Sequence, residues 1–275
     1  MLLEQKELGA DDFVAQLRSL GVVEGDRLMV HASMKALGPM TGGAMGVAEG
    51  LLAAVGPSGT LMAYVSWDHS PYEETLGGAS MTIAERDAWP VFDPADAPPY
   101  SGWGILNTYL LRLPGARRSG NPDASMAAVG KDADYLIADH PLGTGYGPGS
   151  PLERFVKLGG KVLMLGAPLD SVTLLHYTEA VADIPGKRWV TYEVPVLRDG
   201  RKSWEMVREL DSNGIIDVYA REGEPDAVET IATAYVAEGR HREGRVGQAH
   251  CYLFDATDLH KFGLDYLETR HGSGQ

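Results

Sequence analysis

The stretch KVLMLGAPLDSVTLLHYTEAVA, residues 161–182, carries the pattern on which the fold prediction rests. Residues 161–167 are almost all apolar, as expected for a strand buried on both faces. A short Gly166-Ala167-Pro168 turn follows, and residues 171–182 then have the pattern of a helix that Ser171 could cap. A buried strand followed closely by a helix is the unit from which layered α/β proteins are built.

The same alternation of strands and helices continues on both sides of this unit. Residues 26–33 and 59–67 read as strands, with a helix at 46–56 between them. We expect further helices at 11–20, 105–113, 150–158 and 226–239, a short strand at 125–130, and a closing strand and helix within 251–271. Arg198-Asp199-Gly200-Arg201 lies between two apolar stretches and indicates a hairpin. The order predicts a layered α/β core. The length of the chain allows one large domain or two closely packed lobes, and of these we predict a single domain that spans residues 1–275.

Composition and charge limit the classes of function. The chain has 275 residues, of which 44% are hydrophobic, as in an ordinary folded globule. Its formal net charge of −14 disfavours nucleic acids and anionic membranes as partners, and it permits a polycationic ligand, although solubility alone would also explain it. Cys251 is the single cysteine, so no internal disulfide forms. No leader peptide or membrane-length apolar run is visible, and we therefore expect a cytoplasmic protein.

A long segment, residues 68–103, lacks clear periodicity and is rich in acidic and aromatic side chains. Its carboxylates Asp68, Glu73, Glu74, Asp93 and Asp96 alternate with aromatic residues, of which Trp67, Tyr72, Phe92, Tyr100 and Trp103 are the members in or next to it. This mixture suits a ligand with cationic edges and hydrocarbon faces. The alternative is a solvated acidic loop that its aromatic residues hold down. A second acidic group, Asp211, Asp217, Glu222, Glu224 and Asp226, admits the same two interpretations, and the solvated turn is the stronger one for Glu224 and Asp226.

His176 and Glu179 form the sharpest local pattern. They are three residues apart in the helix predicted at 171–182, so they share one face. Glu179 could orient the His176 ring and stabilise its protonated form, which is the arrangement of a general base. A surface histidine–carboxylate pair with no catalytic role is the alternative.

The segment after the first strand, His31, Ala32, Ser33, Met34 and Lys35, could bind a ligand's phosphate. It could equally contain a helix-capping Ser33 and a satisfied histidine. Ser125 could donate a hydrogen bond to an oxyanion, or it could be a turn serine. A buried, inert thiol is the expected state of Cys251.

Several common motifs are absent from the sequence. There is no G-x-x-x-x-G-K-[ST] phosphate loop, no G-x-S-x-G nucleophile elbow and no H-E-x-x-H zinc helix. The R/Q-x-x-G-x-G/A loop with which the common N-acetyltransferase fold holds coenzyme A is also missing.

Taken together, the segments resemble the aminoglycoside 3-N-acetyltransferase family from about Leu17 to the C-terminal helix. The resemblance rests on the shared order of VHASMKALGPM (30–40), GPSGTLMAYVSWDHSPYEE (56–74), FDPADAPPYSGWG (92–104), RRSGNPDASMAAVG (117–130), YGPGSPLERF (146–155), residues 161–182 and DSNG (211–214). Asn121 is a departure, because similar sequences often have a histidine before the proline at this point. We expect Asn121 to make a supporting contact.

The resemblance implies an α/β fold with a central mixed sheet flanked by helices, distinct from the common N-acetyltransferase fold. It implies direct transfer from acetyl-CoA, without a metal, to the 3-amino group of a 2-deoxystreptamine drug. His176 would be the base, Glu179 its orienting partner, and Ser125 or backbone N–H groups the oxyanion donors. The expected cofactor residues are His31, Ala32, Ser33, Met34, Lys35, Gly38 and Ser119. The expected drug residues are Trp67, Asp68, Tyr72, Glu73, Glu74, Asp123, Asp211 and Glu224.

Three other interpretations stay open at this point. The acceptor could be another amine, such as a biosynthetic intermediate. Asp68, His69, His176 and Glu179 could form a metal-dependent hydrolase, and the protein could bind cationic sugars without catalysis. We expect a monomer or a homodimer.

Overall fold

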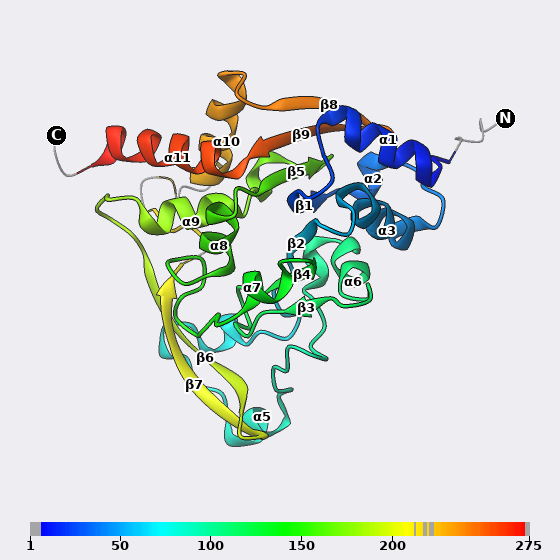
Figure 1. The fold of residues 1–275 in the computed structure, drawn as a ribbon. Helices are drawn as coiled ribbons and strands as arrows, with labels where there is room; N and C mark the ends of the chain where they lie inside the picture. The colour runs from blue at the N-terminus through cyan, green and yellow to red at the C-terminus, as the bar shows by residue number, and fades with distance from the viewer. Residues whose placement is uncertain (1–6, 212, 217–218, 220–222, 273–275) are drawn as a thin grey trace.

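A seven-stranded mixed sheet forms the centre of the protein (Figure 1). The computed structural model describes residues 7–272 except 212, 217–218 and 220–222. The strand order is β3-β4-β2-β1-β5-β9-β8. The strands are β1 Arg27–Ala32, β2 Thr60–Tyr64, β3 Arg117–Arg118, β4 Met126–Gly130, β5 Lys161–Leu165, β8 Arg242–Val246 and β9 Ala249–Asp255. β1 pairs in parallel with β2 and β5, whereas β4, β9, β3 and β8 add antiparallel neighbours. The expected mixed α/β sheet is therefore confirmed.

Helices cover both faces of this sheet, as the alternation of apolar residues along β1 requires. Leu28 and Val30 point to one hydrophobic cluster, and Met29 points to the other. On the first face lie α1 Ala10–Leu20, α2 Met34–Leu37, α3 Gly43–Val55 and α6 Leu106–Leu110. On the second face lie α7 Ala133–Ile137, α8 Pro151–Lys157, α9 Leu174–Val181, α10 Ala227–Ala237 and α11 Ala256–His271.

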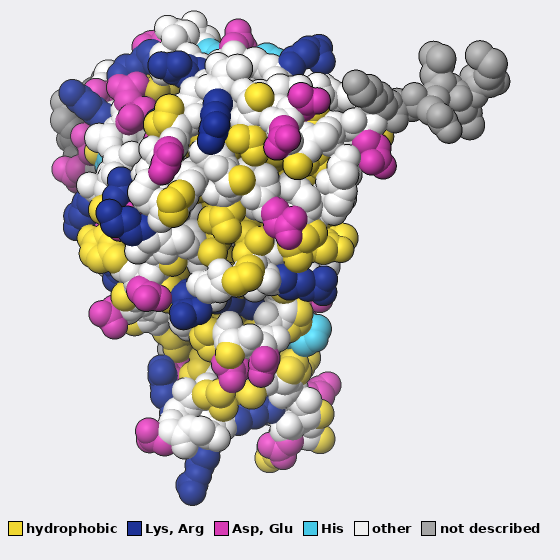
Figure 2. All heavy atoms as spheres, turned by 45° about the vertical axis from the view of Figure 1, so that its right-hand side comes forward, with side chains coloured by type: hydrophobic (Ala, Val, Ile, Leu, Met, Phe, Trp, Pro, Cys, Tyr) yellow, Lys and Arg dark blue, Asp and Glu magenta, His cyan; other side chains and the backbone are white. Residues whose placement is uncertain are grey.

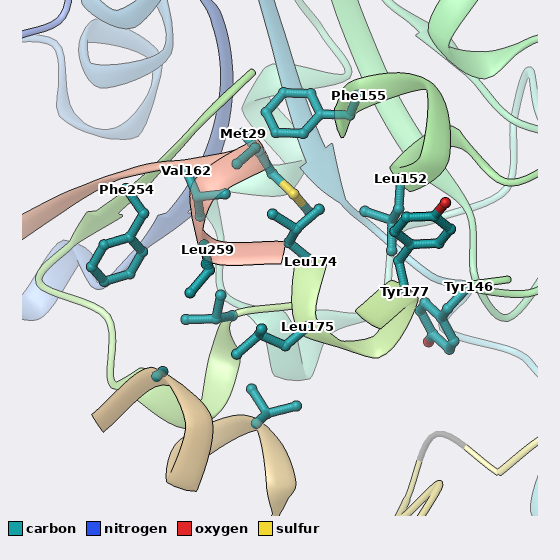
Figure 3. Packing of buried hydrophobic residues seen from close by; sticks show 14 of the residues in the cluster. Met29, Tyr146, Leu152, Phe155, Val162, Leu174, Leu175, Tyr177, Phe254 and Leu259 are labelled. Atoms are coloured by element: carbon teal, nitrogen blue, oxygen red, sulfur yellow. The ribbon is translucent and has the colours of Figure 1, made fainter. Parts of the chain in front are cut away.

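The second face contains the helix that the sequence singled out. Figure 3 shows Leu174 and Leu175 of α9 packed among Met29 of β1, Val162 of β5 and Phe254 of β9. All five side chains are fully buried. This packing fixes α9 against the sheet, and it therefore fixes the position of the polar residues on the other side of the helix.

The turn between β5 and α9 differs from the prediction. The expected cap at Ser171 is wrong, because α9 begins at Leu174 and a separate 3₁₀ turn, η3 Leu169–Ser171, precedes it. The Ser171 hydroxyl donates to the Pro168 carbonyl instead. The turn requires Gly166, whose φ is +69° and whose missing Cβ would lie 2.7 Å from the Cβ of Ala36. β5 and α9 are therefore connected by this tight turn and the 3₁₀ turn, and α9 does not extend back to Ser171.

A two-stranded ribbon projects away from the sheet (Figure 1). Its strands are β6 Trp189–Arg198 and β7 Arg201–Leu210, and Arg198 pairs with Arg201, as the expected hairpin turn requires. Asp199 and Gly200 both have positive φ, which is typical of the two-residue hairpin turn.

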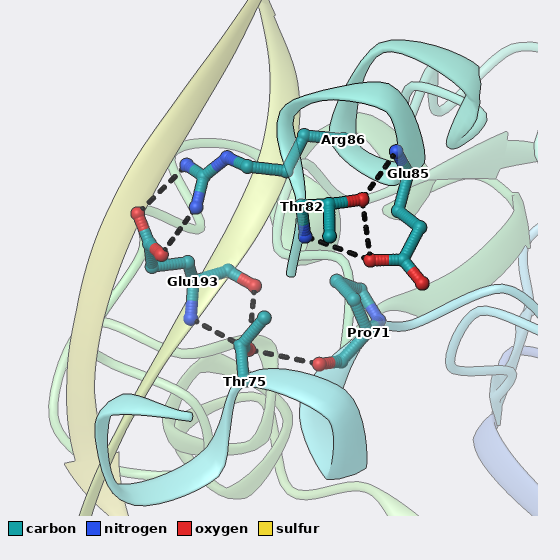
Figure 4. A network of polar contacts seen from close by, with 6 residues as sticks. All are labelled: Pro71, Thr75, Thr82, Glu85, Arg86 and Glu193. Atoms are coloured by element: carbon teal, nitrogen blue, oxygen red, sulfur yellow. Dashed lines mark hydrogen bonds and ion pairs between the residues drawn. The ribbon is translucent and has the colours of Figure 1, made fainter. Parts of the chain in front are cut away.

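The segment 68–103 packs along this ribbon toward its hairpin end, where Lys202 donates hydrogen bonds to the carbonyls of Arg86 and Asp87 (Figure 1). It contains short helices that the sequence did not predict: α4 Tyr72–Thr75, η1 Leu76–Gly78, α5 Ile83–Ala88 and η2 Ser101–Trp103. Two contacts tie it to Glu193 of β6 (Figure 4): Arg86 forms an ion pair of 2.6 Å, and the Thr75 hydroxyl accepts a hydrogen bond from the Glu193 backbone N–H. The segment is an anchored part of the fold, which explains how it can line a site.

Acidic and basic side chains are mixed on the surface and do not form separate patches on the face that Figure 2 presents. Among the described residues, no helix has the length and hydrophobicity needed to cross a membrane.

We predict that Thr75→Val lowers the free energy of unfolding by about 1–3 kcal/mol. The buried hydroxyl also donates to the Pro71 carbonyl at 2.8 Å, a carbonyl that keeps the Thr75 backbone N–H as a donor, so the loss of the hydroxyl leaves the Glu193 N–H without its partner. Urea unfolding measures the effect. Thr75→Ser keeps the hydroxyl and is the control. Equal stability of both variants and the wild type would show that Thr75 does not anchor the segment.

Candidate functional site

A cavity of about 580 Å³ opens at the carboxyl ends of the parallel strands. The segment after β1, the end of β2 and the turn after β5 each contribute to its wall. The lining residues that carry the later argument are His31, Ser33, Lys35, Tyr64, Tyr146 and His176. Open α/β sheets commonly bind ligands at this edge, because neighbouring parallel strands deliver their following loops to one place.

A second cavity of about 300 Å³ lies between the sheet, the 68–103 segment and the β6–β7 ribbon. It shares four lining residues with the first cavity: Tyr64, Trp103, Tyr146 and Asn213. The two cavities therefore meet at an aromatic wall, in which the Tyr146 hydroxyl lies 2.8 Å from that of Tyr64. Two ligands could approach each other across this wall.

His176 lies in the first cavity and is held in a fixed orientation. Its Nδ1 is 2.8 Å from Oε2 of Glu179, whose side chain is only 3% exposed, and the Tyr146 ring packs against the imidazole at a centroid distance of 4.9 Å. Because Nδ1 faces the carboxylate, Nε2 is the nitrogen that can exchange a proton with a ligand. The His176 side chain is itself 19% exposed, so it is accessible as well as oriented.

His31 and Ser33 line the same cavity in different ways. Ser33 caps α2, since its Oγ accepts a hydrogen bond from the Ala36 backbone N–H at 3.2 Å. Nε2 of His31 is buried and has no hydrogen-bond partner among the described residues. The alternative that His31 is a histidine with all its hydrogen bonds made within the protein is therefore wrong. Burial, with a smaller effect of nearby His176, lowers the pKa of His31 to about 4. His31 is therefore neutral at physiological pH.

The second cavity has acidic walls. Asp123 is half-buried, it accepts a hydrogen bond from the Ser70 hydroxyl, and its Oδ2 is buried with no partner in the described part of the chain. Trp67 is also buried and its indole N–H is likewise without a partner there. An unpaired buried carboxylate oxygen is costly, so a cationic ligand would find it already desolvated.

Glu209 and Tyr192 belong to the same cavity, and the sequence reasoning missed both. The Tyr192 hydroxyl donates to the Glu209 carboxylate. Burial raises the pKa of Glu209 to about 7, an effect that the nearby carboxyl of Asp123 reinforces and the Tyr192 hydrogen bond opposes. A signal was present, because Val207 and Glu209 alternate along one strand and therefore face the same side. Their common side is the buried one.

Comparison with known proteins identifies the family. The model of the aminoglycoside 3-N-acetyltransferase family matches residues 29–268. The chain belongs to this family. Over 258 residues it is 62% identical to the aminoglycoside N(3)-acetyltransferase III of Salmonella sp, covering 94% of this chain and 90% of that protein. The predicted family and its acyltransferase class are thereby confirmed.

Solved structures with ligands are also similar to the chain. Sisomicin-bound AAC-VIa superimposes with a TM-score of 0.94 at 48% identity, covering 97% of this chain and all of that one. AAC-IIIb in a binary complex with CoASH gives 0.92 at 39% identity and covers 98% and 100% of the two chains. The chain therefore shares its fold with these two enzymes.

Most of the residues predicted for the two ligands line one of the two cavities. His31, Ala32, Ser33, Met34 and Lys35 line the first cavity. Trp67, Asp68, Tyr72, Glu73 and Asp123 line the second. Glu74 lies instead in a neighbouring open groove with Asp68 and His69.

Other predicted residues lie behind these walls. Ser125 is fully buried, and its hydroxyl lies 3.2 Å from the Ser66 carbonyl and accepts a hydrogen bond from Arg118. Ser119 is fully buried as well and lies 2.9 Å from Nδ1 of His140. Gly38 ends α2 with a φ of +82°. These three residues shape the loops rather than line the two cavities.

The second acidic group is dispersed. Asp211 is buried and forms an ion pair of 2.8 Å with Arg188, and it accepts a hydrogen bond from Tyr72, so it supports a lining residue. Glu224 and Asp226 are exposed, and Asp226 caps α10. Asp217 and Glu222 lie outside the described residues.

Asn121 makes the supporting contact expected of it. Its side chain is buried, its Oδ1 accepts from the Ala124 backbone N–H at 3.0 Å, and its Nδ2 is 3.4 Å from the Pro141 carbonyl. The amide thus fixes the turn that carries Asp123.

The metal-site interpretation finds no support in the geometry. Asp68 and His69 lie in the open groove, away from the cavity that His176 lines. In the described ranges, no group of three or more His, Cys, Asp and Glu side chains is arranged to hold a metal ion.

We predict that Glu209→Gln changes the pH dependence of stability. The carboxyl has a folded pKa of about 7, above its ordinary value of 4.5, so the folded state binds more protons between these values. Wild-type stability therefore falls as pH rises from 4.5 to 7, and the variant should lack this loss. We measure the free energy of unfolding in urea at about pH 5 and pH 8. The difference between variant and wild type should shift in favour of the variant by roughly 1–3 kcal/mol from the lower to the higher pH.

Glu49→Gln, at an exposed position of α3, is the control and should show no such shift. A stability difference between the Glu209 variant and the wild type that is equal at both pH values would mean that this carboxyl is already ionised throughout the range.

Proposed function

We propose that the protein transfers the acetyl group of acetyl-CoA directly to the 3-amino group of a 2-deoxystreptamine aminoglycoside. The observation that carries the proposal is the meeting of two cavities at Tyr64 and Tyr146, with the oriented His176 on one side of the wall. Such an arrangement brings two substrates together, which a simple binding protein does not need.

Acetyl-CoA is proposed to occupy the cavity of His31–Lys35. Lys35 is exposed at this cavity and could pair with a phosphate, whereas the more apolar walls near Ala167 suit the pantetheine arm. The CoASH complex of the similar AAC-IIIb supports this co-substrate.

The drug is proposed to occupy the second cavity. Its ammonium groups would pair with Asp123 and Glu209, neither of which has a cationic partner among the described residues. Trp67 and Trp103 offer apolar surface to the sugar faces. The similar AAC-VIa binds sisomicin, which supports this class of acceptor.

In the proposed reaction His176 acts as the general base. Glu179 holds Nδ1, so Nε2 accepts a proton from the 3-nitrogen as this nitrogen attacks the thioester carbon. The carbon–sulfur bond then breaks, and the proton on His176 passes to the leaving thiolate. The products are the N-acetylated drug and CoA thiol, so atoms and charge balance.

Direct transfer is favoured over a covalent acetyl-enzyme. Cys251 is buried in β9, within the cluster on the α1–α3 face of the sheet, and burial raises the pKa of its thiol. Ser125 is buried away from both cavities. A sequential mechanism therefore needs no nucleophile from the protein.

The proposal is tested by thiol release from acetyl-CoA with a panel of aminoglycosides, each with or without a free 3-amino group. We expect release only with the 3-amino compounds. Release with an unrelated amine alone would favour a biosynthetic acceptor, and binding without release would favour a non-catalytic sugar binder. The cytoplasmic location, the single domain and the monomeric or dimeric state stay predictions.

His176→Ala should lower kcat by about 10²–10⁴-fold and leave the Kd for acetyl-CoA nearly unchanged, because the base acts in the chemical step. Steady-state kinetics and calorimetric titration measure the two quantities. His250→Ala is the matched control, since His250 is exposed on β9 beside Glu243. Near-normal turnover of the His176 variant would remove this residue from the mechanism.

Asp123→Asn should raise the Kd for the drug by at least about 10-fold, because it removes a buried charge that would face an ammonium group. The Kd for acetyl-CoA should not change. Asp96→Asn, at an exposed position of the 68–103 segment, is the control. Equal drug affinity of both variants would mean that only the long-range field of the acidic segment attracts the drug.

A further inference from the structure

His31 is a half-buried residue of the first cavity that the proposed mechanism does not use. It lies at the carboxyl end of β1, beside Met164 of β5 in the sheet register, so it borders the turn that leads to α9 and His176. Its Nε2 is buried and makes no hydrogen bond within the described chain. An unsatisfied buried nitrogen costs about 1–3 kcal/mol, so the fold tolerates it for a reason other than stability.

The other polar groups nearby are already committed. Four hydroxyl groups of this cavity donate within the protein: Ser171 to Pro168, Thr173 to Ser171, Tyr146 to Tyr64, and Tyr64 to the Asp123 carbonyl. The Asn107 amide donates to the Tyr64 carbonyl at 2.8 Å. Ser33 is the exception, because its oxygen accepts the capping hydrogen bond of α2 and its O–H can still donate. A carbonyl oxygen in the depth of this cavity therefore has few side-chain donors to choose from, and His31 is one of them.

Charge decides which role His31 can take. Burial and the neighbouring His176 keep its imidazole neutral, so it does not oppose the positive charge that His176 gains on taking a proton. A neutral imidazole still carries one N–H, and in the tautomer with the hydrogen on Nε2 this group is a donor. A hydrogen bond made there is shielded from water and is stronger for it.

We infer that His31 is a catalytic residue that donates a hydrogen bond from Nε2 to the carbonyl oxygen of the acetyl thioester. The inference rests on the proposed function. When the amine nitrogen bonds to the carbonyl carbon, the π electrons move to this oxygen, and the His31 N–H stabilises the charge without giving up its proton. His176 and His31 thus have opposite tasks, one accepting a proton and the other holding the oxyanion. This role replaces the one that the sequence suggested for Ser125.

The test compares His31→Met with His31→Gln, two side chains of similar length of which only glutamine carries an N–H. We expect the methionine variant to lose about 10²–10³-fold in kcat, as when one oxyanion donor is removed. The glutamine variant should recover at least about 10-fold of this loss. Affinity for the drug, and for S-ethyl-CoA, which lacks the carbonyl oxygen, should stay within about 3-fold of wild type in both variants.

An unchanged kcat in the methionine variant would overturn the inference, and weaker binding of S-ethyl-CoA in that variant would then make His31 a cofactor contact. Thermal unfolding tests whether both variants fold. If the methionine variant does not fold, a glutamine variant that is as inactive as His176→Ala contradicts the inference. Wild type and His176→Ala are measured in the same assay, so that a failure of the proposed function can be told apart from a failure of the role of His31. Absence of thiol release by the wild type defeats the proposed function, whereas an active wild type with an active methionine variant defeats only the role of His31.

Discussion

The parallel pairing of β1 with β5 is the constraint on which the site depends. The register His31↔Met164 and Ala32↔Leu165 brings the ends of both strands to one edge of the sheet. The segment that follows β1 and the turn that follows β5 must then share a cavity, and α9 presents His176 to it. The apolar alternation along both strands, with two faces buried by different helices, holds this register, because a slip of one residue would exchange the two faces.

Two electrostatic environments meet at that edge. On the cofactor side the histidines have different surroundings: Glu179 orients His176, whereas burial keeps His31 neutral. On the other side, the carboxyl groups of Asp123 and Glu209 are buried without a cationic partner in the described chain. Buried carboxyls of this kind are costly in an empty protein, and a polycationic ligand offsets that cost. The aromatic wall of Tyr64 and Tyr146 lies between the two environments. In the proposed reaction, the bond between the drug nitrogen and the acetyl carbon forms where they meet.

The sequence predicts local features well and distant contacts poorly. The strand at 161–167, the hairpin at 198–201 and the pairing of His176 with Glu179 depend on neighbours within a few residues, so periodicity and turn chemistry were sufficient. Glu209 approaches Asp123 only because the base of the β6–β7 ribbon borders the same cavity as the turn before β4, and no local pattern encodes that proximity. The Ser171 cap failed because Gly166 inserts a rigid turn before α9. Several site residues came from family resemblance rather than from physical reasoning on the chain.

The central claim is that His176 takes its proton from the amine of a drug held across the aromatic wall from the cofactor. A crystal structure of the ternary complex with CoA and a 3-amino aminoglycoside tests it most directly. The account predicts the 3-nitrogen within about 2.6–3.2 Å of Nε2 of His176, with the CoA sulfur on the His31 side of the wall. A drug bound with its 3-nitrogen beyond hydrogen-bonding reach of this ring, and next to a different base, would contradict it.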